Sequence, residues 1–201
     1  MKVVEFFGIS RAGKTTQIRD LAAFLGENYS VSVFERPNIN FRDMRGMDEF
    51  HNVLLDSMIN AYEGALSRGD DFLLYDRGFY DRRVMVAKDQ SEGLISDSLK
   101  GDLGEKVELY MAEVTHPFLF IIPPSVSIDR MSAQRREGLD NSRLTNGLKT
   151  RDSYEGIAEL IDDYRSLRKD YPKIVQVGNG HSIEETTRLI RSILGVESCT
   201  K

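Results

Sequence analysis

Eight consecutive residues near the start of the chain give the clearest chemical signal in the sequence. Residues 8–15 read GISRAGKT and match the pattern GxxxxGK[ST] of a phosphate-binding loop, or P-loop. In such a loop the glycines let backbone N–H groups turn toward phosphates, and the following helix directs its positive end at them. Lys14 would then reach the β- and γ-phosphates of ATP, and the hydroxyl of Thr15 would ligate Mg²⁺. The motif therefore predicts that the chain binds ATP with Mg²⁺.

An aspartate and an arginine form the second signal. Asp76 and Arg77 directly follow the apolar run FLLY, which is typical of a strand. A carboxylate at the end of a strand is the expected magnesium partner of a P-loop, so Thr15 and Asp76 are the predicted metal ligands. The guanidinium of Arg77 would face phosphate, where its planar fork can donate two hydrogen bonds. Lys14, Asp76 and Arg77 are therefore candidate catalytic residues.

Short apolar runs alternate with longer amphipathic ones along the chain. The predicted strands are 3–7, 31–34, 72–75, 118–122 and 174–177, and the predicted helices are 14–25, 50–66, 125–136, 152–170 and 182–194. Apolar strands separated by helices indicate an α/β fold with a parallel sheet that is buried on both faces. Such a sheet binds ligands at the carboxyl ends of its strands, where both signals fall. Two polar stretches, 88–105 and 137–149, are predicted to be surface loops, and the second is equally compatible with a lid.

Composition narrows the choice of partners. The chain of 201 residues is expected to form one domain, 1–201, and its formal net charge of -5 disfavours binding to a nucleic-acid polymer. Cys199 is the only cysteine, so no intramolecular disulfide can form, as is usual in a reducing cytosol. No run approaches about 20 apolar residues, and 3–7 is too short for a signal peptide, so no membrane association is expected. We therefore expect a cytoplasmic protein that acts on small molecules.

Several separated stretches match one known family in their order and spacing. They are Phe6–Gln17 (FFGISRAGKTTQ), Asp76-Arg77, Pro123-Pro124, Arg130 with Arg135-Arg136, and Tyr171-Pro172. Together they resemble the thymidylate kinase family, one of the P-loop nucleotide and nucleoside kinases. The resemblance implies a P-loop three-layer sandwich with a five-stranded parallel sheet of order 2-3-1-4-5, helices on both faces and a lid at 135–150. It also implies a homodimer that makes dTDP from dTMP and ATP.

On the ATP side, the resemblance adds residues from the loop and from later in the chain. Arg11 matches a P-loop arginine that one subtype places against the transferred phosphoryl group, so it becomes a further catalytic candidate. Arg130 would lie near the adenine, Arg135 would belong to the lid, and Asn179 would lie in a turn beneath the adenine. The predicted ATP-binding residues are Gly8, Ser10, Arg11, Ala12, Gly13, Lys14, Thr15, Thr16, Arg130, Arg135 and Asn179.

On the acceptor side, the resemblance implies a phosphate clamp. Glu35 and Arg36 fall where the family has an acidic–basic pair, so Arg36 and Arg77 would hold the acceptor's phosphate. The predicted acceptor-binding residues are Glu35, Arg36, Phe50, Arg77 and Asp81.

Three departures from the family pattern all fall on this acceptor side. Ser10 replaces an acidic residue that orients the sugar, and Leu54-Leu55 stand where the family has an arginine that binds phosphate. Asp81-Arg82-Arg83 replace small polar residues that face thymine. The resemblance therefore supports phosphoryl transfer more firmly than it supports thymidylate as the acceptor.

Two other activities remain open. A deoxynucleoside kinase is similar at Asp76–Arg82 (DRGFYDR), and in that case Glu35 would take the proton from the 5′-hydroxyl of a nucleoside. Because Glu35 and Arg36 are adjacent, the sequence supports both kinds of acceptor. A P-loop switch that hydrolyses NTP is a third hypothesis, but the sequence lacks the Asn-Lys-x-Asp stretch with which GTPases read guanine. Phosphorylation of a nucleoside monophosphate is the preferred hypothesis.

Overall fold

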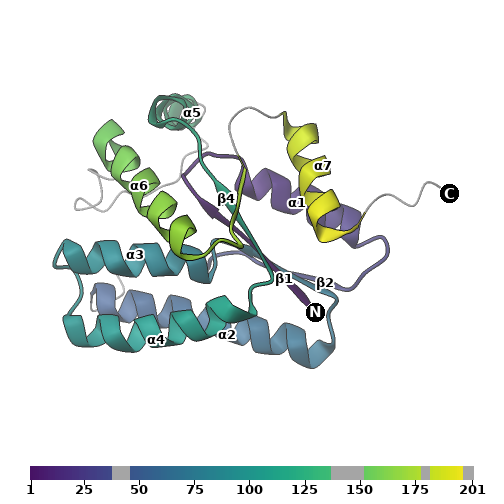
Figure 1. Ribbon diagram of the computed structural model, residues 1–201, viewed down its shortest axis with the longest axis horizontal. Helices are drawn as coiled ribbons and strands as arrows, with labels where there is room; N and C mark the ends of the chain where they lie inside the picture. Colours follow the sequence, from purple (N-terminus) through teal and green to yellow (C-terminus); the bar gives the residue numbers. More distant parts are fainter. Residues whose placement is uncertain (38–45, 137–151, 178–181, 197–201) are drawn as a thin grey trace.

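The structure, a computed structural model, has a central sheet with helices on both faces (Figure 1). It describes residues 1–37, 46–136, 152–177 and 182–196. The strands of the sheet are β1 (Lys2–Gly8), β2 (Val31–Phe34), β3 (Phe72–Asp76), β4 (His116–Phe120) and β5 (Val175–Val177). All pairs of neighbouring strands are parallel, and their order is β2-β3-β1-β4-β5. The predicted fold and strand order are therefore confirmed.

The helices cover the two faces of the sheet in separate groups. They are α1 (Lys14–Leu25), α2 (Met47–Arg68), α3 (Phe79–Ser91), α4 (Asp97–Glu113), α5 (Pro124–Arg136), α6 (Tyr154–Asp170) and α7 (Ile183–Leu194). Figure 1 shows α1 and α7 together on one side of the sheet, and α2, α3, α4 and α6 on the other. The described residues thus form the three layers of the predicted sandwich. None of these helices combines the length and the apolar composition that crossing a bilayer requires.

The central strand β1 belongs to both halves of the hydrophobic core, because successive side chains of a strand point to opposite faces. Val4 and Phe6 pack with residues of α1 and α7. Val3 and Phe7 pack with residues of the helices on the other face. This double burial explains why the sequence of the strand is almost continuously apolar.

One loop prediction was wrong. Residues 88–105 were expected to form a surface loop, but α3 extends to Ser91 and α4 starts at Asp97. The side chain of Ser96 caps α4 by accepting a hydrogen bond from the backbone N–H of Leu99. Leu103, Val107 and Met111 are buried at a spacing of four residues, as on one face of a helix. The many polar residues and glycines between these positions obscured that helical pattern in the sequence.

Glu5 is an exception to the apolar character of β1. It lies on the same face as Val3 and Phe7 and is fully buried. Its carboxyl group accepts hydrogen bonds from the backbone N–H groups of Gly78 (3.0 Å), Tyr80 (3.1 Å) and Asp81 (3.0 Å). These groups belong to the start of α3, where backbone donors lack partners within the helix. Glu5 therefore caps α3 from the middle of the sheet.

The ionisation of Glu5 should make stability depend on pH. Burial raises the pKa of Glu5 from 4.5 to about 8, although the three backbone donors oppose this shift. The folded protein therefore holds this proton more tightly than the unfolded chain does. The corresponding contribution to stability is complete below about pH 4.5 and is lost as the pH rises toward 8, at up to ~1.4 kcal/mol per pH unit.

We expect Glu5→Gln, which cannot ionise, to flatten this dependence. Urea denaturation of both proteins between about pH 5 and about pH 8 measures the slope of the unfolding free energy against pH. The wild-type slope should be the more negative. Parallel slopes would show that Glu5 does not titrate in this range.

Candidate active site

The phosphate-binding loop connects β1 to α1 at the carboxyl edge of the sheet, as the sequence predicted. Gly8 has a φ of +115°, and a Cβ atom there would lie 2.3 Å from the carbonyl oxygen of Phe120, so only glycine fits. Gly13 has a φ of +91°, and a Cβ atom there would meet no other atom within 4 Å. The loop is thus closely packed where it leaves the strand and open where it meets α1, which starts at Lys14. An anion at this open end would meet the positive end of α1.

Lys14 is held inside the loop. Its Nζ atom donates hydrogen bonds to the carbonyl oxygens of Ile9 (2.6 Å) and Gly8 (3.2 Å), and the residue is only 5% exposed. Burial lowers the pKa of Lys14 well below its usual value, and the neighbouring positive charge of Arg77 lowers it further. A bound polyphosphate would offset both effects by supplying negative charge next to the ammonium group.

Thr15 and Asp76 form a pair of oxygen ligands. The Thr15 hydroxyl donates a hydrogen bond of 2.6 Å to the Asp76 carboxylate. This contact follows from the register of the sheet, which pairs Phe6 of β1 with Asp76 of β3. No group of three or more His, Cys, Asp or Glu that could hold a metal occurs in the described part of the chain. Mg²⁺ is commonly bound by one or two protein oxygens together with phosphate oxygens and water, so this pair fits the ion.

Arg77 occupies a strained position next to Asp76. Its φ is +65°, in the left-handed region that costs a non-glycine residue roughly 1–3 kcal/mol. The guanidinium donates hydrogen bonds to Asp81 (2.9 Å) and to the hydroxyl of Ser10 in the loop (3.2 Å). Asp81 also accepts a hydrogen bond of 2.6 Å from Tyr164 of α6. Burial alone would raise the pKa of Asp81, but Arg77 and Arg82 outweigh it and hold the pKa below its usual value.

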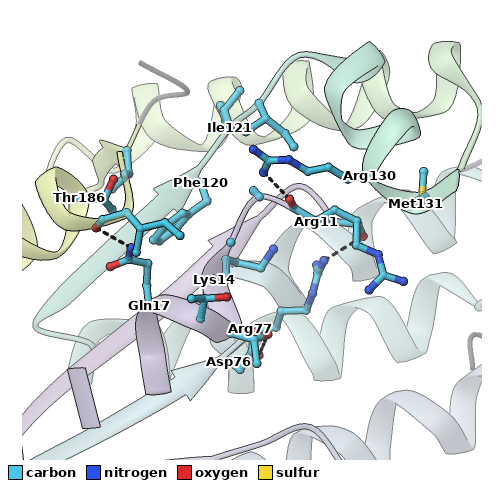
Figure 2. A pocket seen from close by; sticks show the side chains of 18 of the residues that line it. Arg11, Lys14, Gln17, Asp76, Arg77, Phe120, Ile121, Arg130, Met131 and Thr186 are labelled. Carbon is cyan, nitrogen blue, oxygen red and sulfur yellow. Dashed lines mark hydrogen bonds between the residues drawn. The ribbon is translucent and has the colours of Figure 1, made fainter. Parts of the chain in front are cut away.

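A cavity of about 820 Å³ opens over the loop and is large enough for a nucleotide-sized ligand. Lys14, Asp76, Arg77 and Arg11 gather toward one end of it, whereas Phe120, Gln17 and Thr186 lie at the other (Figure 2). The charged end suits a polyphosphate, and the less charged end suits the base and sugar of a nucleotide. The remaining lining residues are Ser10, Ala12, Gly13, Thr15, Thr16, Arg36, Ile121, Ile122, Arg130, Met131, Ala133, Gln134, Asp152, Val177, Ser182 and Ile183.

Two side chains of helix α5 donate hydrogen bonds to the backbone of the loop. Arg130 donates a hydrogen bond of 2.8 Å to the carbonyl oxygen of Arg11 (Figure 2). Ser127 donates one of 3.0 Å to the carbonyl oxygen of Ser10. Arg11 has a φ of +62°, so the backbone that receives the Arg130 contact is also in the left-handed region. These bonds keep α5 beside the loop, where its side chains line the cavity.

Comparison with solved structures places this geometry in a known fold. The chain resembles deoxyadenosine kinase from M. mycoides with bound dATP at a TM-score of 0.65 and 14% identity, covering 97% of this chain and all of that one. It resembles the same enzyme with bound dCTP at a TM-score of 0.63 and 16% identity, covering 98% and 100%. The chain has the fold of these kinases. No protein-family profile and no curated protein sequence matches it.

Within this kinase fold, Arg36 and Glu35 differ in position at the end of β2. Arg36 lines the cavity, and its guanidinium lies 5.1 Å from the centre of the Phe50 ring. The surrounding protein and the positive charges of Arg82 and Arg77 lower the pKa of Arg36 to about 10. Both residues are exposed, but Glu35 is not among the described residues that line the cavity. Of the two neighbours, the cation therefore faces the site.

The structure brings most of the predicted site residues together. Ser10, Arg11, Ala12, Gly13, Lys14, Thr15, Thr16, Arg36, Asp76, Arg77 and Arg130 all line the one cavity. Phe50 and Asp81, predicted to bind the acceptor, are buried behind Arg36 and Arg77 respectively. Asn179 and residues 137–150 of the predicted lid lie outside the described residues, as does the side chain of Arg135. Their predicted roles remain predictions.

Several residues that build the site were missed by sequence reasoning. Gln17 connects α1 to α7: its amide donates a hydrogen bond of 3.0 Å to the carbonyl of Ile183 and accepts one of 2.9 Å from the hydroxyl of Thr187. Gln17 and Thr186 line the less charged end of the cavity. No motif marks these positions, because they meet only when the helices pack. Glu5 did leave a signal, since a charged residue in a strand buried on both faces is rare unless it has partners.

We expect Asp76→Asn to raise the magnesium concentration needed for half-maximal activity by about tenfold or more, and to slow the reaction. An amide keeps the size of the side chain but loses the negative charge that attracts the ion. The measurement is a magnesium titration of ADP release, with Asp102→Asn on the exposed surface of α4 as the matched control. An unchanged titration would make Asp76 a structural partner of Thr15 only.

Proposed function

We propose that the chain transfers the γ-phosphoryl group of ATP to a nucleoside monophosphate. The observation that supports this acceptor most directly is that Arg36, and not Glu35, lines the cavity. A monophosphate is held by convergent cations through charge-assisted hydrogen bonds. Arg36 and Arg77 both line the cavity, and Arg77 lies close enough for its positive charge to lower the pKa of Arg36. Such mutual repulsion between two guanidinium groups is relieved by an anion bound between them.

Chemistry supports the same acceptor. Phosphate oxygens are already ionised and nucleophilic near neutral pH, so the acceptor needs no general base. An acceptor oxygen forms a bond to the γ-phosphorus while the bond to the bridging oxygen breaks, and ADP leaves. Lys14 and Arg77 stabilise the negative charge on the migrating group by position and charge, which such loose transition states chiefly require. Thr15 and Asp76 would hold the Mg²⁺ that neutralises part of this charge.

Within this class, dTMP is the first acceptor that we propose. It rests on the resemblance of the loop, the Asp76-Arg77 pair and the later arginines to thymidylate kinases. The residues that depart from that family pattern include Ser10 and Asp81, both of which contact Arg77. They therefore modify the surroundings of the acceptor, while the GxxxxGK[ST] positions of the loop, Gly8, Gly13, Lys14 and Thr15, are retained.

A nucleoside kinase is the second candidate, and the fold comparison favours it. The similar structures compared above are of a deoxyadenosine kinase, and a third structure of that enzyme contains the product dCMP. In this case Glu35 would act as the base for a 5′-hydroxyl group. Glu35 is not among the described residues that line the cavity, and this is the reason we rank this candidate second.

A panel of nucleosides and nucleoside monophosphates, each supplied with ATP and Mg²⁺, tests the proposal. ADP release reports turnover, and mass spectrometry identifies the phosphorylated product. We expect monophosphates to be preferred and dTMP to give dTDP. Faster turnover of nucleosides would establish the second candidate. ADP release that does not depend on any acceptor would instead indicate an NTP-hydrolysing switch.

A further inference from the structure

The backbone groups that Glu5 caps directly follow Arg77, a residue of the candidate active site. The three backbone groups that Glu5 binds belong to Gly78, Tyr80 and Asp81, and the residue immediately before them is Arg77. Glu5 thus holds the chain just after the left-handed turn at Arg77. On the other side of the turn, the backbone N–H of Arg77 donates a hydrogen bond of 2.9 Å to the carbonyl of Phe6, the next residue of β1.

The contact between Glu5 and Gly78 leaves no room for a side chain at residue 78. A Cβ atom on Gly78 would lie 2.8 Å from both Cδ and Oε2 of Glu5, which is closer than such atoms approach in real structures. The glycine is therefore needed for the carboxyl group to reach the backbone of α3. Residue 78 has a negative φ of -108°, outside the left-handed region, so it is this contact and not a positive φ that requires glycine.

We infer that Glu5 is a positioning residue for Arg77. By binding the start of α3, it sets the turn from which the Arg77 side chain projects and thereby the place of the guanidinium. Asp81, whose backbone N–H Glu5 binds, uses its own side chain to hold the same guanidinium. One buried carboxyl group in the sheet therefore holds both the backbone that follows Arg77 and the residue, Asp81, whose side chain binds the guanidinium. As a statement about catalysis, the inference rests on the proposed function.

A double-mutant cycle separates positioning of Arg77 from general support of the fold. Glu5→Gln keeps the size of the side chain but has only one oxygen, so at least one of the three backbone donors loses its acceptor. The cycle combines Glu5→Gln with Arg77→Ala and measures the dissociation constant of inorganic tripolyphosphate by calorimetry. It also measures kcat and KM for the best acceptor of the panel. Glu27→Gln, at an exposed position after α1, is the matched control.

We expect Arg77→Ala and Glu5→Gln each to weaken tripolyphosphate binding by about fivefold to tenfold, and the double variant to be no weaker than Arg77→Ala alone. In the enzyme assay, Glu5→Gln should lower kcat while Arg77 is present and have little effect in its absence. Equal factors with and without Arg77 would overturn the inference, because Glu5 would then act on the site independently of Arg77. No effect of Glu5→Gln on binding would overturn it as well.

A second variant covers the case in which Glu5→Gln does not fold. Gly78→Ala disturbs the same contact from the other side, and it should show the same non-additivity with Arg77→Ala. The binding measurement and the activity measurement also allow this inference and the proposed function to fail independently. If the wild-type protein phosphorylates nothing in the panel, the proposed function fails, while the tripolyphosphate cycle still tests whether Glu5 positions Arg77.

Discussion

Replacing Lys14 by alanine is expected to reduce phosphoryl transfer by roughly 10²–10³-fold or more without unfolding the protein. Stabilisation of developing charge by a preorganised donor is usually the largest single contribution to catalysis, and loss of one such donor has costs of this order. Lys14 is the cation that the loop itself encloses, through the carbonyl oxygens of Gly8 and Ile9.

The fold should tolerate this substitution. Lys14→Ala removes two hydrogen bonds, but it also removes a buried positive charge that lies close to Arg77 and Arg11. These effects oppose each other, so we expect the melting temperature to change by no more than about 4 °C. Lys106→Ala, at an exposed position of α4, is the matched control and should retain activity. Transfer within tenfold of wild type would mean that the P-loop assignment is wrong.

The parts of the fold that could be predicted from the sequence are those with local patterns. The strands next to the site are short apolar runs, because a parallel sheet covered on both faces leaves few polar positions. The helices α3 and α4 were missed because their buried residues are widely spaced among polar ones. Their apolar faces depend on contacts with each other and with α2, which the local sequence does not reveal.

The candidate site also has parts that could be predicted from local sequence patterns and parts that could not. The position of the loop between a strand and a helix could be predicted because phosphate binding requires a fixed spacing within eight residues, from Gly8 to Thr15. The partnership of Thr15 with Asp76, 61 positions apart, could be predicted because parallel strands end at one edge. The choice between Glu35 and Arg36 could not, since adjacent residues at the end of a strand point in different directions and only the three-dimensional structure shows which one faces the cavity.

The second large expected effect concerns the acceptor and depends on whether Arg36 or Glu35 contacts it. On the best acceptor of the panel, we expect Arg36→Ala to lower kcat/KM by about tenfold to a hundredfold. This range corresponds to the loss of one charge-assisted hydrogen bond, worth ~1.5–3 kcal/mol. Glu35→Gln should cost little, because a monophosphate needs no base. Arg165→Ala, on the exposed surface of α6, controls for the loss of an arginine elsewhere.

The ranking of the two variants is more informative than either value alone. A 5′-hydroxyl acceptor would reverse it, since general-base catalysis typically contributes ~10²–10⁴-fold and Glu35→Gln would remove the base. Arg36→Lys refines the comparison, because lysine keeps the charge but not the planar fork that binds two phosphate oxygens. If Arg36 binds phosphate in this way, Arg36→Lys should recover only part of the activity lost in Arg36→Ala. If Glu35→Gln is far more damaging than Arg36→Ala, and nucleosides react faster than monophosphates, the acceptor is a nucleoside hydroxyl and Glu35 is its base.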